Sequence, residues 1–139
     1  MLPLRVVLDT NIVVSAALKP DGLQRTVFLF AVTKPARLYV TSVILAEYRE
    51  VLARPELGIR KGVQQQFLQI IKARAHLTFP SRQLDVANDP DDNIFLECAD
   101  AAKADYLVTG NLRHFPTYWT KTKVVSTKDF ITMVAPHLG

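Results

Sequence analysis

The chain has 139 residues, 49% of them hydrophobic and 22% charged, a length and composition that predict one globular domain over residues 1–139. A formal net charge of +4 and a pI near 9.4 allow a polyanionic partner, although a basic solvated surface explains them equally well. The single cysteine, Cys98, excludes an intrachain disulfide, and no apolar run approaches the length of a membrane span. We therefore expect a cytoplasmic protein with no membrane partner.

The elements expected from the sequence alternate between short apolar strands and amphipathic helices. In chain order they are a strand at 4–8, a helical segment interrupted at 20–22 and continuing over 23–32, a strand at 38–40, helices at 43–54, 63–77 and 92–104, strands at 106–109 and 123–126, and a helix at 128–135. Thr41 or Ser42 is placed to cap the helix at 43–54, and Pro55 is placed to end it.

Short, continuously apolar strands that alternate with helices are typical of a parallel sheet covered on both faces. We predict an α/β fold of three layers, α/β/α, around a central, mainly parallel sheet of about four to five strands. Ligands in such folds bind beyond the carboxyl ends of the strands, near a switch in strand order. Asp9 directly follows the first predicted strand and Asn111 follows the strand at 106–109, so both are expected at this edge.

Three of the 13 acids stand out because they lie among apolar residues. Asp9 interrupts the apolar run RVVLDTNIVV, and Asp92 lies on the apolar side of its predicted helix. Glu47 shares the apolar stripe of its helix with Ile44 and Tyr48. A carboxylate on a core-facing side is costly unless it is paired or binds a metal. We therefore interpret these acids as functional.

Structural explanations for the acids remain open. An arginine at the helix edge would neutralise Glu47, and helix capping would explain Asp89 and Asp91, since acids are favoured at a helix N-terminus. Glu50 is interpreted as structural, because its four-residue spacing to Arg54 favours a surface ion pair.

Motifs for other phosphate and cation sites are missing from the sequence. The segment DPDDNIFLECAD fails as an EF-hand loop, because Ile94 stands at the required glycine and Asp100 at the terminal glutamate. Neither GxxxxGK[ST] nor GxGxxG is present, which argues against a nucleotide-binding loop.

Four blocks of sequence resemble, in order, a PIN domain of the branch related to VapC-type toxins. They are VVLDTNIVVSA, TSVILAEYREVLARP, NDPDDNIFLECADAAKADYLVTGNLRHF and VVSTKDFI, which together extend over essentially the whole chain. The resemblance implies a three-layer fold and a metal-dependent ribonuclease site in which Asp9, Glu47 and Asp92 are the catalytic, metal-binding acids. It further implies Mg²⁺ or Mn²⁺ as cofactor, single-stranded or loop RNA as substrate, a cognate antitoxin, and a homodimer or higher homo-oligomer.

The chain departs from the family pattern at the fourth acid, where it has Asn111. An amide oxygen can ligate a hard cation but brings no charge, which favours one tightly bound ion with a second recruited by substrate. Asp91 is a further candidate ligand. Thr10, Asn11 and Thr109 are expected to brace the metal site. Helix capping by Asn11 and a plain strand end at Thr109 are the open alternatives.

Arg113, His114 and Lys121 follow Asn111 and are candidates for contact with the RNA backbone, with solvated surface charge as the alternative. The apolar segment at 27–32 suits either a dimer interface or a wholly buried helix. Two other functions stay open: a non-catalytic RNA- or protein-binding module of PIN-like fold, and a structure-specific DNA nuclease. For a ribonuclease of this kind we expect attack by water, which leaves a 5′-phosphate and a 3′-hydroxyl.

Overall fold

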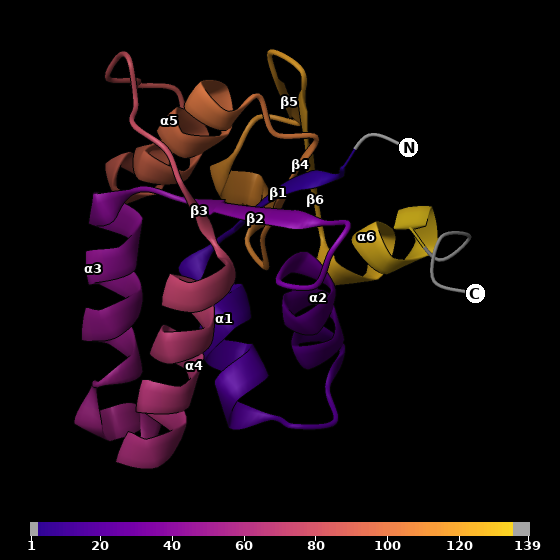
Figure 1. The fold of residues 1–139 in the computed structure, drawn as a ribbon. Helices are drawn as coiled ribbons and strands as arrows, with labels where there is room; N and C mark the ends of the chain where they lie inside the picture. Colours follow the sequence, from indigo (N-terminus) through magenta and orange to yellow (C-terminus); the bar gives the residue numbers. More distant parts are fainter. Residues whose placement is uncertain (1–2, 135–139) are drawn as a thin grey trace.

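The computed structural model describes residues 3–134, in which strands and helices alternate along the chain (Figure 1). The strands are β1 (Arg5–Leu8), β2 (Arg37–Val40), β3 (His76–Leu77), β4 (Tyr106–Val108), β5 (Tyr118–Trp119) and β6 (Thr122–Val125). The α-helices are α1 (Thr10–Leu18), α2 (Leu23–Ala31), α3 (Ser42–Leu52), α4 (Lys61–Arg74), α5 (Asn93–Ala102) and α6 (Thr127–Val134). Three short 3₁₀ turns lie between them, η1 (Pro55–Leu57), η2 (Pro90–Asp92) and η3 (Leu112–His114).

The strands form one sheet in the order β3-β2-β1-β4-β6-β5. All neighbours are parallel except β5, which pairs antiparallel with β6. The order runs outward from β1 in two directions, so the switch in strand order falls between β1 and β4. This arrangement confirms the predicted α/β fold with its mainly parallel sheet. The sheet has six strands rather than four or five because two strands of two residues each are added at its edges.

Helices cover both faces of the sheet, which confirms the predicted three layers (Figure 1). Helix α5 packs on one face against β1, β2 and β4. Helices α1, α2, α4 and α6 lie on the other face, where α1 packs against α2 and α2 against α6 (Figure 1). Among the described residues, none of the helices combines the length and the apolar character needed to cross a membrane.

One predicted helix boundary is wrong. The helix expected at 63–77 ends at Arg74, and the next residue, Ala75, is already extended. His76 and Leu77 instead pair as β3 with Tyr39 and Val40 of β2. The last residue of the helix expected at 128–135 lies outside the described residues.

Strand β1 lies in the core and is bonded at its carboxyl end to α3. All of Val6, Val7 and Leu8 are fully buried, as expected for a central strand covered on both faces. The buried Tyr48 of α3 donates its hydroxyl to the Leu8 carbonyl at 2.5 Å, which fixes α3 at the carboxyl end of β1. Helix α2 is not wholly buried, because Leu29 is 49% exposed.

Candidate active site

Asp9 lies at the switch point, directly after β1 and at the start of α1. Its backbone is extended and its amide donates to the Val108 carbonyl of β4 at 3.0 Å, yet its side chain makes no capping bond to α1. Instead, Asp9 Oδ2 accepts hydrogen bonds from Thr109 Oγ1 at 2.7 Å and from Asn11 Nδ2 at 3.3 Å. The carboxylate is therefore held mainly by polar side chains, although the residue is only 5% exposed.

The loop after β4 is bonded to the start of α1. Thr109 is fully buried, and its hydroxyl both donates to Asp9 and accepts the Asn111 amide at 3.0 Å. Asn11 Oδ1 accepts the Gly110 amide at 3.2 Å, and a Cβ on Gly110 would come within 3.4 Å of the Asn11 side chain. Capping of α1 by Asn11 is excluded, because Asn11 lies inside the helix. Thr109 is likewise not a plain strand end, because its hydroxyl links Asp9 to the Asn111 amide.

Glu47 faces the same hollow as Asp9. The hollow holds about 370 Å³, and Asn111 also lines it. The buried Thr10 hydroxyl donates a short hydrogen bond to Glu47 Oε2. Glu47 is half-buried rather than fully core-facing. Within residues 3–134 neither Glu47 nor Asp9 forms an ion pair, so neutralisation of Glu47 by an arginine finds no support.

The predicted surface pair is present beside this hollow. Arg54 Nη2 lies 3.3 Å from Glu50 Oε1, four residues earlier on α3, and both side chains are largely exposed. The predicted ion pair is thus confirmed, and the structural role of Glu50 stays a prediction.

Asp92 closes the turn η2 ahead of α5 and makes no capping bond to that helix. Its Oδ2 lies 2.9 Å from Nδ1 of His114 in η3. One ligand atom from each of Asp89, Asp92 and His114 lies within 4.8 Å of the others. Asp89 also caps η2 by accepting the Asp91 amide at 3.0 Å, whereas the exposed Asp91 side chain lies outside this group.

The structure does not bring all predicted residues to the site. Arg113 is exposed and lines a hollow of about 510 Å³ together with Asn111 and His114, close to the acids. Lys121 lies in the turn between β5 and β6, before the amino end of β6. Because the parallel strands place Asp9 at their carboxyl ends, Lys121 is at the opposite edge of the sheet, which corrects its predicted placement.

The sequence does not predict the contribution of two residues, Asp89 and Asn93, to the acidic site. The sequence predicts only a capping role for Asp89, whereas the structure also places it beside Asp92 and His114. Asn93 is buried, and its Oδ1 accepts the amides of Val86 and Ala87 at 3.0 and 2.8 Å, which holds the loop before η2 against α5. The only signal for Asn93 was an amide side chain in the first turn of an otherwise apolar helix.

The surroundings of the site raise the pKa values of two of its acids, Asp9 and Asp92. Burial raises the pKa of Asp9 from 3.8 to about 6; the Thr109 hydrogen bond opposes this rise, while the charges of Asp92 and Glu47 add to it. Burial also raises the pKa of Asp92, and its hydrogen bond with His114 opposes that shift. A cation bound among these groups would relieve both effects.

The fold and this acidic switch-point site define a PIN-type α/β domain, and the family comparison agrees. A model of the PIN domain family matches residues 5–113, most of the chain. The chain therefore belongs to the PIN domain family, whose members are in general nucleases.

Two proteins of known sequence or structure are similar to this chain. The uncharacterized protein MJ1680 of Methanocaldococcus jannaschii is 27% identical over 113 residues, which cover 79% of this chain and 72% of that protein. Among solved structures, one match is a chain in the crystal structure of VapBC2 from Rickettsia felis, in which VapBC2 is bound to a DNA fragment from its promoter. The TM-score of this match is 0.59. That match covers 88% of this chain and 98% of the other at 20% identity, so it shows the shared fold alone.

Proposed function

We propose that this protein is a metal-dependent endoribonuclease that hydrolyses phosphodiester bonds in single-stranded or loop RNA. The observation that carries this proposal is the way its acids are held. Both side-chain donors to Asp9 bind Oδ2, the Thr10 hydroxyl binds only Oε2 of Glu47, and His114 binds only Oδ2 of Asp92. Each carboxylate thus has one anchored oxygen and one oxygen left without a side-chain partner among the described residues, as a metal ligand requires.

The donor set fits a hard divalent cation such as Mg²⁺ or Mn²⁺, which prefers carboxylate and amide oxygens. We assign Asp9, Glu47 and Asp92 as the principal ligands. The Asn111 side chain is a further oxygen donor on the wall of the same hollow. When bound, the ion supplies positive charge that offsets the carboxylates and polarises the scissile phosphate. Thr10, Asn11 and Thr109 keep the acids oriented through the hydrogen bonds described above.

His114 and Asp89 are proposed to supply ligands in place of the carboxylate that Asn111 does not provide. Both lie beside Asp92 with ligand atoms within 4.8 Å, and an imidazole nitrogen favours a transition-metal ion over Mg²⁺. We therefore expect Mn²⁺ to support activity at least as well as Mg²⁺. Asp91 is not assigned this role, because its side chain is exposed to solvent. Arg113 remains a candidate for contact with the RNA backbone, since it is exposed beside Asn111.

Protein partners are proposed from the family membership and from exposed apolar side chains. Membership of the PIN family and the likeness to a VapBC2 chain support a cognate antitoxin as a protein partner. Exposed leucines on α2, Leu23 and Leu29, support a homodimer or higher homo-oligomer. We further propose that residues 1–139 form a single domain that acts in the cytoplasm.

Cleavage of a mixed single-stranded RNA pool in Mg²⁺, Mn²⁺ or EDTA tests this function. Wild type is compared with Glu47→Gln and with the matched control Glu50→Gln, which removes an exposed acid from the same helix. We expect metal-dependent cleavage that falls by at least about 100-fold in Glu47→Gln and is unchanged in Glu50→Gln.

The amide at Asn111 favours one other function, a non-catalytic RNA- or protein-binding module. No cleavage with either metal, by protein shown to be folded and free of antitoxin, would support that module instead. Preference for flap DNA over single-stranded RNA would support a DNA nuclease.

A further inference from the structure

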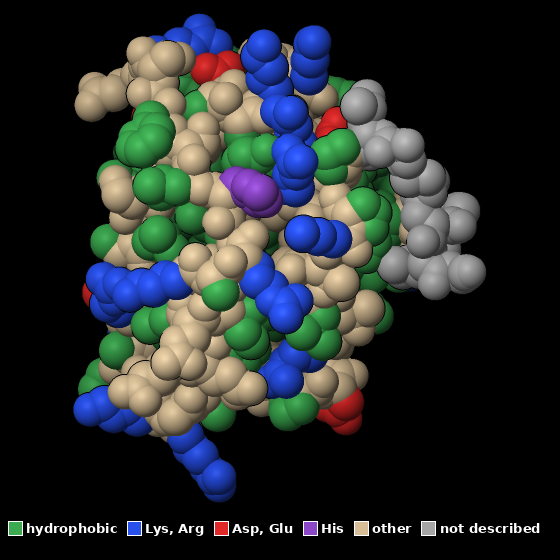
Figure 2. All heavy atoms as spheres, in the orientation of Figure 1, with side chains coloured by type: hydrophobic (Ala, Val, Ile, Leu, Met, Phe, Trp, Pro, Cys, Tyr) green, Lys and Arg blue, Asp and Glu red, His purple; other side chains and the backbone are tan. Residues whose placement is uncertain are grey.

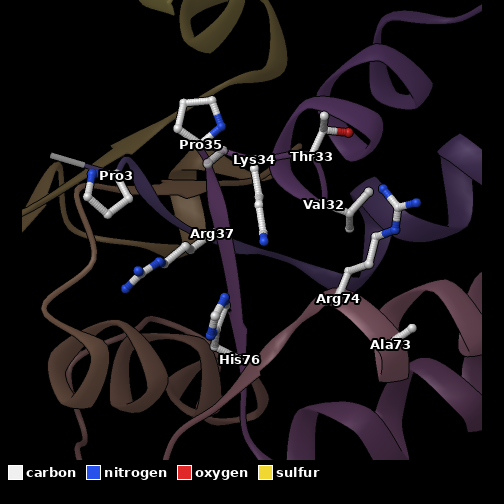
Figure 3. A pocket seen from close by; sticks show the side chains of 10 residues that line it. Pro3, Val32, Thr33, Lys34, Pro35, Arg37, Ala73, Arg74 and His76 are labelled. Atoms are coloured by element: carbon white, nitrogen blue, oxygen red, sulfur yellow. The ribbon is translucent and has the colours of Figure 1, made fainter. Parts of the chain in front are cut away.

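A second, larger hollow lies at the opposite edge of the sheet from the acids. It holds about 900 Å³ and is formed by the amino ends of β1, β2 and β3 with the end of α4 and the segment after α2. The proposed catalytic site makes no use of it. Its wall includes Lys34, Arg37, Arg74 and His76, together with Pro3 and Pro35 (Figure 3). We call this hollow the amino-edge groove.

The amino-edge groove is positively charged and contains no acid. Lys34, Arg74 and His76 are exposed, Arg37 is half-exposed, and none of them forms an ion pair within residues 3–134. Lys34 and His76 reach toward one another across β2 (Figure 3). Figure 2 shows Lys and Arg side chains gathered in a row on this face, from the β5 hairpin toward β2, with few acids between them.

Two arginines lie at this edge of the sheet, and only one of them, Arg37, lines the groove. Arg5 of β1 and Arg37 of β2 are register partners, so two like charges project from the same face of neighbouring strands. Like charges in such positions destabilise a sheet unless they are compensated. The Arg5 guanidinium is compensated within the fold, because its Nη1 donates to the Ala102 carbonyl at the end of α5 at 2.9 Å and the group lies 5.8 Å from the centre of the Tyr39 ring. The Arg37 guanidinium has no side-chain hydrogen bond or ion pair among the described residues. Arg37 is therefore the guanidinium at this edge that remains available to an anion in the groove.

The groove suits several phosphates rather than one. Its cations come from two separate segments of the chain, Lys34 and Arg37 from one and Arg74 from the other, and they line a hollow far larger than a single phosphate needs. The guanidinium of Arg37 or Arg74 can bind phosphate oxygens in a bidentate fashion. Pro3 and Pro35 supply apolar surface between the cations, against which a ribose or base can pack. These features match the backbone of a single-stranded nucleic acid.

We propose that the amino-edge groove binds the phosphates of the same RNA strand that enters the acidic site. This inference rests on the proposed ribonuclease function. The four residues of β1 or β2 span only about 13 Å at roughly 3.3 Å per residue. An RNA of about ten nucleotides, within the usual range for a small single-strand-binding domain, therefore reaches from one edge of the sheet to the other.

The test is binding of a fluorescently labelled 12-nucleotide RNA, measured by anisotropy, in an Asp9→Asn background that prevents cleavage. Lys34→Gln/Arg74→Gln removes two groove cations. Lys19→Gln/Lys61→Gln is the matched control, because it makes the same charge change at exposed sites outside the groove. Lys61 begins α4, about 20 Å along the helix from Arg74 at 1.5 Å per residue.

We expect the groove variant to raise Kd about tenfold, and to reduce the slope of log K against log salt by roughly 1.4, or about 0.7 for each phosphate that the protein no longer neutralises. The control should change Kd by less than about twofold. A labelled DNA strand of the same sequence should lose affinity to the same extent, since backbone phosphates are the recognised groups. Equal RNA binding by the groove and control variants, or an unchanged salt slope, overturns the proposal. Because the readout is binding without cleavage, this failure is distinct from failure of the ribonuclease function.

Discussion

Replacing Asp9 by asparagine should stabilise the metal-free protein, even though it removes the residue assigned to metal binding. The carboxylate is buried, and its pKa of about 6 in the folded protein stands above the ordinary value of 3.8. The first cause is burial, which disfavours the charged form, and the charges of Asp92 and Glu47 act in the same direction. Ionisation of Asp9 therefore opposes folding in the absence of a cation.

The magnitude follows from the size of the shift. A rise from 3.8 to about 6 is roughly 2.2 pH units, or about 3 kcal/mol at 1.36 kcal/mol per unit. Between these two values the folded state holds a proton that the unfolded state has released, so stability falls as pH rises from about 4 to about 6. About one pH unit above the folded pKa the loss is complete, and it then stays constant. Asparagine carries no charge, and its amide oxygen still accepts from Thr109.

The assay is urea unfolding in EDTA between pH 4 and 8, on wild type and on Asp9→Asn. Because every other titrating group is shared, the difference between the two proteins reports Asp9 together with its charge interactions with Asp92 and Glu47. We expect the asparagine variant to gain about 1–3 kcal/mol relative to wild type between pH 4 and 6 and to keep that advantage at pH 7.5. A variant less stable than wild type at pH 7.5, or a difference independent of pH, would refute the reasoning.

Three further outcomes test the site. Thr109→Val removes the donor that lowers the pKa of Asp9, so the acidic limb of the cleavage pH profile should move to higher pH and activity should fall about 10–100-fold. His114→Ala should weaken Mn²⁺ binding by about 10–100-fold, as measured by titration calorimetry, and an unchanged affinity would exclude His114 as a ligand. Mass spectrometry of the cleaved RNA should show 5′-phosphate and 3′-hydroxyl ends, whereas 2′,3′-cyclic phosphates would contradict attack by water.

The position of Asp9 was predictable because it depends on local pattern and on a general rule of parallel sheets. A β-branched run that stops at an acid predicts a buried strand followed by a polar side chain at the sheet edge. Glu47 was found from helical spacing alone, although that spacing overstated its burial. Both predictions needed only residues within one or two turns of the acid.

Contacts between loops were not predictable in this way. His114 meets Asp92 across 22 residues, and each belongs to a 3₁₀ turn whose orientation no periodicity specifies. His76 and Leu77 continued the helical pattern of 63–77, but pairing with β2 overrode it. Lys121 follows Asn111 by only ten positions, yet the β5–β6 hairpin carries it to the other edge of the sheet. Tertiary pairing decided all three cases.

Binding of Mn²⁺, followed by electron paramagnetic resonance as the signal of the free ion disappears, tests most directly whether Asp9 holds a divalent cation. Wild type should bind Mn²⁺, Asp9→Asn should lose at least about 100-fold in affinity, and Asp21→Asn, which alters an exposed loop acid, should bind as wild type does. Wild-type affinity in Asp9→Asn would mean that the ion is held elsewhere, and it would contradict the assignment of Asp9 as a metal ligand.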